Sequence, residues 1–150
     1  METCDKGLEW LRTQPEVDPA RVWVMGGHGG SYGSEAALLE ASRRPDLVHG
    51  VIAVSPSNSV TVSFPANGRS PWTVGGQDVP FTALFGNPDP ADNPAALIPV
   101  ETVGGPVLAV GGETDTLWPS CPYANAIMSR LDAKGFAHPH EVYAYPQAGH

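Results

Sequence analysis

The chain has 150 residues, of which 41% are hydrophobic, and this is enough sequence for one domain with a buried core. Its net charge of −8 argues against nucleic acid or an anionic membrane as a partner, and no segment approaches the roughly 18 apolar residues that span a bilayer. The amino terminus does not resemble a signal peptide, and two cysteines, Cys4 and Cys121, do not predict a disulfide framework, so we expect a cytoplasmic protein.

Helical and extended patterns alternate along the first third of the chain. Apolar positions at helical spacing predict a helix over residues 4–14, which ends before Pro15. A short apolar run at residues 22–25 predicts a buried strand, and residues 34–44 favour a second helix. A second buried strand is expected over residues 47–56.

The pattern is then interrupted by residues 56 to about 98. This segment is rich in Pro, Gly, Asn and Ser and carries little periodicity, so we expect a long excursion with one short helix. After it, residues 105–112 predict a third strand and residues 121–135 a helix that ends at Gly135. Residues 140–146 predict a fourth strand.

This order of elements is typical of βαβ units, and it predicts an α/β fold with a mostly parallel sheet of about four strands flanked by helices. The strands are continuous apolar runs, which favours a sheet covered on both faces. No internal repeat or second domain is visible. In such sheets the reactive groups gather at the carboxyl ends of the strands.

A glycine-rich turn lies between the first predicted strand and the helix that follows it. Residues 29–33, Gly-Gly-Ser-Tyr-Gly, fit the G-x-S-x-G pattern of a nucleophile elbow, in which small residues let strand and helix pass close together. Ser31 is the candidate nucleophile, and the backbone N–H of Tyr32 is the candidate oxyanion donor. The alternative is a glycine loop that only packs a βα turn.

A serine nucleophile needs a base that takes its proton and an acid that orients the base. Glu113 and Asp115 follow the third predicted strand, and His150 follows the fourth. Serine, acid and histidine therefore occur in the chain order of α/β-hydrolases. The alternative for these residues is a solvated loop carboxylate or a helix cap, together with an ordinary terminal histidine.

Longer segments, spread over nearly the whole chain, each look like part of one family: "GLEWLRTQPEVDPARV", "GGSYGSEAALL", "VIAVSPSNSV", "SPWTVGGQDVPF", "IPVETVGGPVLAVGGETDTLWPS" and "YPQAGH". They resemble the acyl-CoA thioester hydrolases and bile acid-CoA:amino acid N-acyltransferases, in their carboxy-terminal α/β-hydrolase domain. The stretches "SPWT..G..VPF" and "D..WPS" are much more specific than the elbow.

The resemblance implies Ser31 as nucleophile, Asp115 as the acid of the triad and His150 as the base, with Glu113 as the second choice of acid. The acyltransferase branch carries cysteine at the elbow, so serine favours hydrolysis through an acyl-serine intermediate. The substrate implied is a small acyl thioester or ester, with no cofactor and no metal.

Relative to this family, the sequence begins at the helix before the elbow strand. We therefore expect residues 1–150 to form a partial α/β-hydrolase catalytic domain without its N-terminal strands, with one face or edge of the sheet exposed. A complementary N-terminal half or a homo-oligomer is the expected partner. Residues 26–28 look like an insertion before the elbow, and His150 is expected on a frayed terminus.

Two other functions stay open at this point. One is a general carboxylesterase or serine peptidase of the same fold, and the other is a catalytically inactive fragment that serves as a binding or dimerisation module. Several further side chains are interpreted without a catalytic role: surface residues (His138, His140, Glu141), a buried thiol (Cys121), packing residues (Trp72, Trp118) and a minor candidate for contact with CoA phosphates (Arg43, Arg44).

Overall fold

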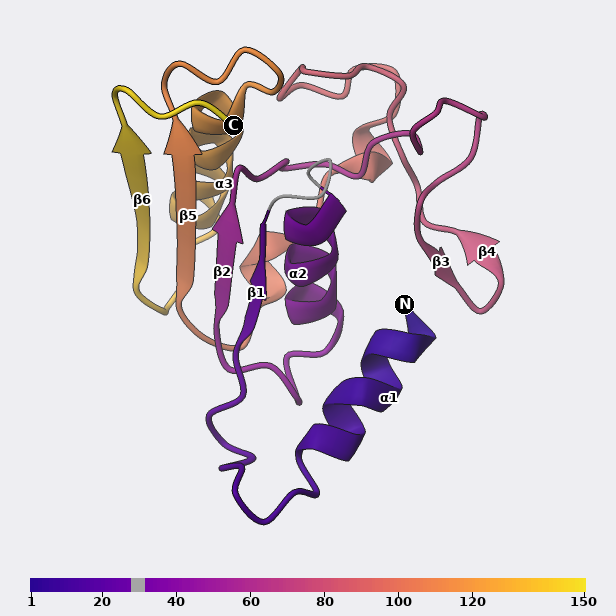
Figure 1. The fold of residues 1–150 in the computed structure, drawn as a ribbon, viewed down its shortest axis with the longest axis vertical. Helices are drawn as coiled ribbons and strands as arrows, with labels where there is room; N and C mark the ends of the chain where they lie inside the picture. The colour runs from indigo at the N-terminus through magenta and orange to yellow at the C-terminus, as the bar shows by residue number, and fades with distance from the viewer. Residues whose placement is uncertain (28–31) are drawn as a thin grey trace.

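The computed structural model describes residues 1–27 and 32–150. Its elements agree with the predicted ones to within a few residues and appear in the same order (Figure 1). They are α1 (Glu2–Leu11), β1 (Val24–Gly26), α2 (Tyr32–Arg43), β2 (Val51–Val54), β3 (Thr73–Val74), β4 (Gln77–Asp78), η1 (Pro94–Ala96), η2 (Val100–Thr102), β5 (Val107–Gly112), α3 (Ser120–Ala133) and β6 (His140–Tyr145).

The main sheet has four strands in the order β1-β2-β5-β6, and every neighbouring pair is parallel. Val51 in β2 lies between Val24 and Val107, and this register continues across the sheet. Parallel neighbours require crossover connections, which α2, the excursion and α3 supply. The predicted α/β class and the parallel sheet are confirmed.

Both long crossover helices pack on one face of the sheet (Figure 1). A side chain added at Gly26 in β1 would collide with Gly33 in α2, and one added at Gly111 in β5 would collide with Cys121 in α3. Val51 and Val107 point to the same face and are almost completely buried. The helices and the sheet therefore form two layers around one core.

The opposite face of the sheet is open among the described residues. Met25 in β1 is 70% exposed and Tyr143 in β6 is 51% exposed, while Ile52 and Leu108 between them are half-buried. The expectation of a sheet covered on both faces is therefore wrong for this part of the chain. An exposed face is also expected from the sequence, and the exposure of Met25 and Tyr143 agrees with that expectation.

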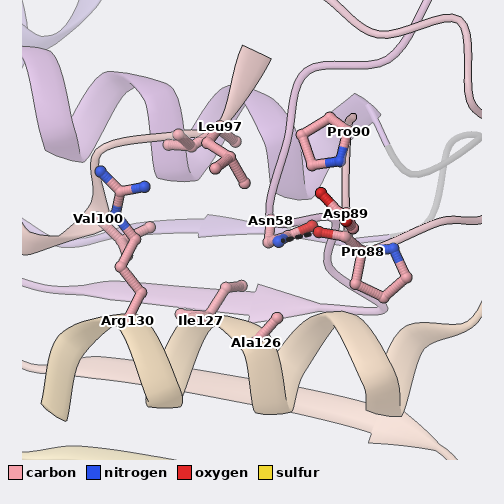
Figure 2. A pocket seen from close by; sticks show the side chains of 10 residues that line it. Asn58, Pro88, Asp89, Pro90, Leu97, Val100, Ala126, Ile127 and Arg130 are labelled. Atoms are coloured by element: carbon pink, nitrogen blue, oxygen red, sulfur yellow. Dashed lines mark hydrogen bonds between the residues drawn. The ribbon is translucent and has the colours of Figure 1, made fainter. Parts of the chain in front are cut away.

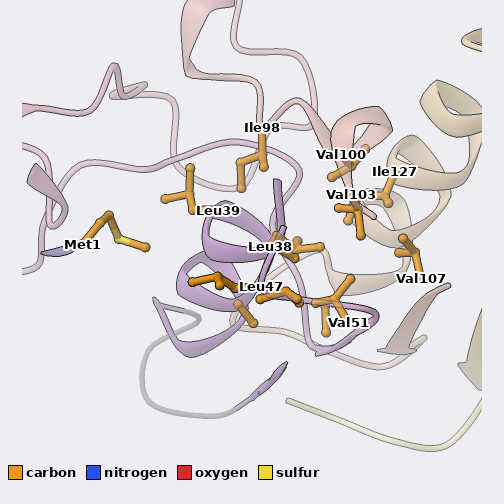
Figure 3. Packing of buried hydrophobic residues seen from close by; sticks show 14 of the residues in the cluster. Met1, Leu38, Leu39, Leu47, Val51, Ile98, Val100, Val103, Val107 and Ile127 are labelled. Atoms are coloured by element: carbon orange, nitrogen blue, oxygen red, sulfur yellow. The ribbon is translucent and has the colours of Figure 1, made fainter. Parts of the chain in front are cut away.

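The core lies between α2, α3 and the buried face of the sheet (Figure 3). Leu38 from α2 and Ile127 from α3 pack in one cluster with strand residues, with Val100 in η2 and with Val103 directly after η2. Burying one such side chain contributes roughly 1.5–3 kcal/mol to folding. This layer fixes the strand ends that carry the polar residues described next.

The excursion between β2 and β5 contains more structure than the sequence predicts. It forms a small antiparallel hairpin from β3 and β4, whose turn uses Gly75 and Gly76 at φ +58° and +75°. Glycine adopts these values at little cost, whereas other residues are strained there. The one short helix expected in this segment corresponds to η1.

Candidate active site

Two of the predicted site residues meet where β5 and β6 end. Asp115 follows β5 and His150 follows β6, and His150 Nδ1 lies 3.0 Å from Asp115 Oδ2. The Asp115 side chain is 1% exposed and that of His150 is 11% exposed. The two residues are distant in the chain, but adjacent parallel strands bring their carboxyl ends to one edge of the sheet.

The loop that carries His150 is held in place by backbone contacts. The N–H and hydroxyl of Thr114 both donate to the carbonyl oxygen of Ala148, at 3.1 and 2.9 Å. A Cβ atom at Gly112 would collide with the carbonyl oxygens of Ala148 and Gly149, so glycine is required for this approach. The expectation of a frayed terminus is therefore wrong, because the loop is tied to the residues after β5.

Asp115 is held as a carboxylate. Its burial opposes ionisation, but hydrogen bonds from His150, from nearby Ser120 and from the backbone of Trp118 outweigh burial and lower the pKa of Asp115. Its second oxygen, Oδ1, accepts the N–H groups of Leu117 and Trp118 at 3.1 and 3.0 Å. A carboxylate only accepts hydrogen bonds, so the proton between the two side chains belongs on His150 Nδ1, and Nε2 is the basic nitrogen.

Trp118 anchors the acid loop to the rest of the site. Its ring is 2% exposed, and Nε1 donates to the carbonyl oxygen of Pro56 at 2.8 Å, which joins the loop after β5 to the loop after β2. Phe85 from the excursion packs edge-on against it, with 4.7 Å between ring centroids. The packing role expected for Trp118 is confirmed.

The other predicted site residues, Glu113, Ser31 and Tyr32, are not part of this pair. Glu113 is exposed, and its side chain makes no hydrogen bond with another described residue, so the geometry favours Asp115 over Glu113 as the acid. Ser31 lies outside the described residues. Tyr32 is the first residue of α2, and its hydroxyl donates to the carbonyl oxygen of Val62 at 2.8 Å.

The strand before the serine and the helix after it approach closely. A Cβ atom at Gly26 would collide with the carbonyl group of Gly33, and one at Gly33 would collide with that of Gly27. Such contact between strand and helix backbones explains why this part of the sequence needs small residues. It also places the first turn of α2 at the carboxyl end of β1.

One buried acidic residue close to the predicted elbow was not singled out from the sequence. Glu35, in the first turn of α2, is fully buried and accepts hydrogen bonds from Thr61 and from the indole of Trp72. Trp72 therefore donates a hydrogen bond in addition to packing. The only sequence signal for Glu35 is its place one turn after a predicted elbow.

The remaining candidates are explained by local contacts. His140 Nε2 lies 2.9 Å from Asp132 Oδ1, and the described residues contain no group of three side chains suited to hold a metal ion. Cys121 is buried, and burial raises the pKa of its thiol, as a structural cysteine requires. The interpretations of His140 and Cys121 as non-catalytic are consistent with these contacts.

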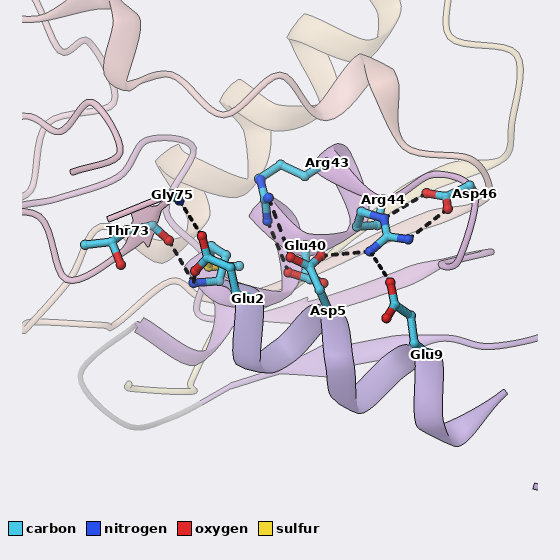
Figure 4. A network of polar contacts seen from close by, with 10 residues as sticks. Glu2, Asp5, Glu9, Glu40, Arg43, Arg44, Asp46, Thr73 and Gly75 are labelled. Carbon is cyan, nitrogen blue, oxygen red and sulfur yellow. Dashed lines mark hydrogen bonds and ion pairs between the residues drawn. The ribbon is translucent and has the colours of Figure 1, made fainter. Parts of the chain in front are cut away.

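Arg43 and Arg44 are occupied by acidic neighbours at the far end of α2 (Figure 4). Arg44 forms ion pairs with Asp5 and Asp46 at 3.1 and 3.0 Å, and Arg43 approaches Asp5 and Glu40 at 3.7 and 3.6 Å. These arginines lie at the opposite end of the helix from Tyr32, so they are poor candidates for a contact with CoA phosphates.

A cavity of about 230 Å³ lies between α3 and the excursion (Figure 2). Its wall is mainly apolar, and Asn58 closes one side by donating from Nδ2 to the carbonyl oxygen of Pro88 at 2.8 Å. Arg130 at its edge is paired with Glu101 through two hydrogen bonds. Neither Asp115 nor His150 lines this cavity, so it is separate from the candidate site.

The four-stranded parallel sheet with its crossover helices has the fold of the α/β-hydrolases. Solved structures of this class have the same fold. An acylaminoacyl peptidase from Pyrococcus horikoshii superposes with a TM-score of 0.65 at 15% identity, covering 99% of this chain and 22% of the peptidase. Acetyl xylan esterase 1 from Thermoanaerobacterium gives 0.56 at 20% identity, covering 97% of this chain and 45% of the esterase.

The chain belongs to the family described as BAAT / Acyl-CoA thioester hydrolase C terminal, whose model matches residues 1–150. It is 28% identical over its whole length to acyl-coenzyme A thioesterase 1 from Mus musculus, and it spans 37% of that protein. It is also 27% identical to the mitochondrial acyl-coenzyme A thioesterase 2 from the same species, of which it spans 34%. The predicted family is therefore confirmed. Within residues 1–27 and 32–150, no helix is both long and apolar enough to cross a membrane.

Proposed function

We propose that this chain is a partial α/β-hydrolase catalytic domain whose serine hydrolase activity cleaves acyl-CoA thioesters or related acyl esters. Ser31 is the nucleophile, His150 the base and Asp115 the acid. The observation that carries the proposal is the buried pair of Asp115 and His150, 3.0 Å apart. Membership of a thioester hydrolase family supports the choice of substrate.

The proposed reaction has two halves. His150 Nε2 takes the proton of the Ser31 hydroxyl as its oxygen attacks the thioester carbonyl carbon, and Asp115 stabilises the imidazolium that forms. The oxyanion accepts the backbone N–H of Tyr32. When the tetrahedral intermediate collapses, the C–S bond breaks and the thiolate takes the proton from His150. Water then gives a proton to His150 Nε2 and attacks the acyl carbonyl carbon. The C–O bond to Ser31 breaks, the serine oxygen takes the proton back from His150, and the acid is released.

The same proposal extends to the partner of this chain and to its location in the cell. Because the chain spans 37% of acyl-coenzyme A thioesterase 1 from Mus musculus, we expect a complementary N-terminal part or a second copy to lie beside it in the active protein. A cytoplasmic location is proposed, although matched relatives include mitochondrial and peroxisomal proteins. No cofactor enters the proposed chemistry.

A fluorophosphonate probe tests the nucleophile. Such a probe forms a stable bond with an activated serine, so we expect labelling of the wild-type chain that disappears in Ser31→Ala and falls about 10³-fold or more in His150→Gln. A folded chain that is not labelled would favour the inactive binding module instead. Labelling that persists in Ser31→Ala would place the nucleophile elsewhere.

Turnover of paired substrates tests the substrate class. An acyl-CoA and a p-nitrophenyl ester with the same acyl chain present the same carbonyl group with different leaving groups. We expect a higher kcat/KM for the acyl-CoA. A preference for the p-nitrophenyl ester, with the thioester untouched, would support a general carboxylesterase of the same fold.

A further inference from the structure

Glu35 is a buried acidic residue that the proposed reaction does not use. It is the fourth residue of α2 and has no exposed surface. Its carboxylate faces three hydrogen-bond donors: Thr61 Oγ1 at 2.7 Å, Thr61 N at 3.3 Å and Trp72 Nε1 at 3.2 Å. Each of these groups is suited to an ionised carboxylate, which only accepts hydrogen bonds.

The charge of Glu35 has no cationic partner among the described residues. No lysine, arginine or histidine of residues 1–27 and 32–150 forms an ion pair with it. Burial raises its pKa to about 7, and the hydrogen bonds from Thr61 and Trp72 oppose this rise. The other titratable groups whose pKa values respond to its charge are Tyr32 and Tyr123. An apolar side chain would fill this space without the cost of burying a carboxylate. Packing alone therefore does not explain a glutamate here.

A second contact joins the same turn of α2 to the same segment. The Tyr32 hydroxyl donates to the carbonyl oxygen of Val62, next to Thr61, and the Tyr32 ring packs edge-on against Trp72. The segment is itself anchored, because the N–H of Val62 donates to the carbonyl oxygen of Thr82 at 2.9 Å. Glu35 and Tyr32 thus fasten the start of α2 to a fixed part of the excursion.

The start of α2 is also where the proposed oxyanion donor lies. The first N–H groups of a helix have no partner within the helix, so the N–H of Tyr32 is free of the helical ladder. Catalysis is sensitive to displacements of about 1 Å, and the loss of one oxyanion donor costs about 10²–10³ in turnover. We propose that Glu35 is a positioning residue that holds the first turn of α2 against Thr61 and Trp72, and so keeps the Tyr32 N–H aimed at the oxyanion. This inference rests on the proposed function.

The same helix offers a matched control. Glu40 is also a buried glutamate of α2, but it lies towards the other end of the helix, beside Asp5 and Arg43 (Figure 4). Glu40→Gln therefore removes a buried carboxylate from α2 without touching the turn that begins at Tyr32.

The test compares steady-state kinetics of acyl-CoA hydrolysis in Glu35→Gln, Glu40→Gln and the wild-type protein. Because an oxyanion contact forms only in the transition state, we expect kcat of Glu35→Gln to fall about 100-fold with KM changed less than about threefold. Glu40→Gln should keep the wild-type kcat. A kcat for Glu35→Gln equal to that of the wild type, or an equal loss in both variants, would overturn the inference.

The indole N–H signal of Trp72 gives a readout that does not depend on turnover. Its ¹⁵N-edited NMR resonance, identified by its absence in Trp72→Phe, should titrate near pH 7 in the wild type and stay constant in Glu35→Gln. A resonance that does not respond to Glu35 would contradict the proposed contact.

Further variants cover the other outcomes. If Glu35→Gln does not fold, Thr61→Val removes one donor to the carboxylate and should lower kcat about 10-fold at constant KM, and an unchanged kcat overturns the inference. If the wild-type protein hydrolyses neither thioester nor ester, the proposed function fails and this inference fails with it. Turnover that is indifferent to Glu35 and Thr61 removes the inference alone.

Discussion

At the scale of single residues, the proposed chemistry depends most on Asp115. It is buried, accepts two backbone N–H groups and bonds to His150 Nδ1. Asp115→Asn keeps the size of the side chain but reverses the hydrogen bond to the imidazole, which then carries its proton on the wrong nitrogen. We expect kcat for thioester hydrolysis to fall about 10³–10⁴-fold, measured in steady state.

Glu113→Gln is the control for this prediction, because Glu113 lies in the same turn and is exposed. Its kcat should stay within about twofold of the wild-type value. The assignment of the acid would be reversed if Glu113→Gln lost activity and Asp115→Asn retained it.

The two buried glutamates of α2 make stability depend on pH. The pKa values of Glu35 and Glu40 are raised to about 7 from the ordinary value of 4.5, mainly by burial. Between these pH values the folded state binds more protons than the unfolded state. Their contribution to the free energy of unfolding is therefore complete below about pH 4.5 and is lost as the pH rises through 7.

Glu40→Gln cannot titrate at this position, so its free energy of unfolding should fall less between pH 4.5 and 8 than that of the wild type. Urea denaturation across this range, with the variants compared at each pH, measures the difference. Parallel curves for the two proteins would show that Glu40 titrates normally in the folded state.

At the scale of elements, the contact between the loop after β5 and the loop after β6 positions Asp115 and His150, the proposed catalytic pair. Gly112, the last residue of β5, leaves room for the backbone of Ala148 and Gly149 just before His150. Gly112→Ala should displace this loop and lower kcat about 100-fold, since catalysis tolerates roughly 1 Å of displacement. The comparison variant is Gly7→Ala in α1, where an added Cβ meets nothing within 4 Å.

Gly7→Ala should keep the wild-type kcat and raise the free energy of unfolding by about 0.5–1 kcal/mol, because alanine loses less backbone entropy in a helix. Thermal denaturation and steady-state kinetics on both variants check the pair of predictions. A fully active Gly112→Ala would mean that the close approach of the loop is not needed for catalysis.

Long apolar strands and strand ends were predictable from the sequence, and other features were not. β5 is a continuous apolar run and is therefore predictable as a strand. The carboxyl ends of adjacent parallel strands lie at the same edge of the sheet, so residues that directly follow β5 and β6, such as Asp115 and His150, are expected to lie close together. The hairpin of β3 and β4 was missed because two-residue strands carry no periodicity. The burial of Glu35 could not be predicted because a single glutamate in a helix usually faces solvent, and only tertiary contacts bury it.

At the scale of the whole molecule, one face of the sheet is open among the residues that the structure describes. It combines exposed Met25 and Tyr143 with half-buried aliphatic side chains, and parallel sheets are normally covered on both faces. Exposed apolar surface of this kind promotes association. The isolated chain should bind the dye ANS and form larger species as its concentration rises.

A variant with Met25→Lys and Tyr143→Lys should bind less dye and remain smaller at the same concentration, as measured by dye fluorescence and analytical ultracentrifugation. Trp10→Lys is the control, because Trp10 is a 64% exposed aromatic residue that belongs to α1 and not to a strand of the sheet. Equal effects of all lysine substitutions would show that net charge, and not the open face, governs association.

Trapping the acyl intermediate tests the proposed reaction most directly. The protein is mixed with an acyl-CoA, quenched in acid within the first turnover and digested, and the peptides are weighed by mass spectrometry. We predict an added acyl group on the peptide that contains Ser31, and none in Ser31→Ala. An acyl group on another residue, or turnover with no acylated peptide at any time, would contradict a mechanism in which the Asp115–His150 pair activates Ser31.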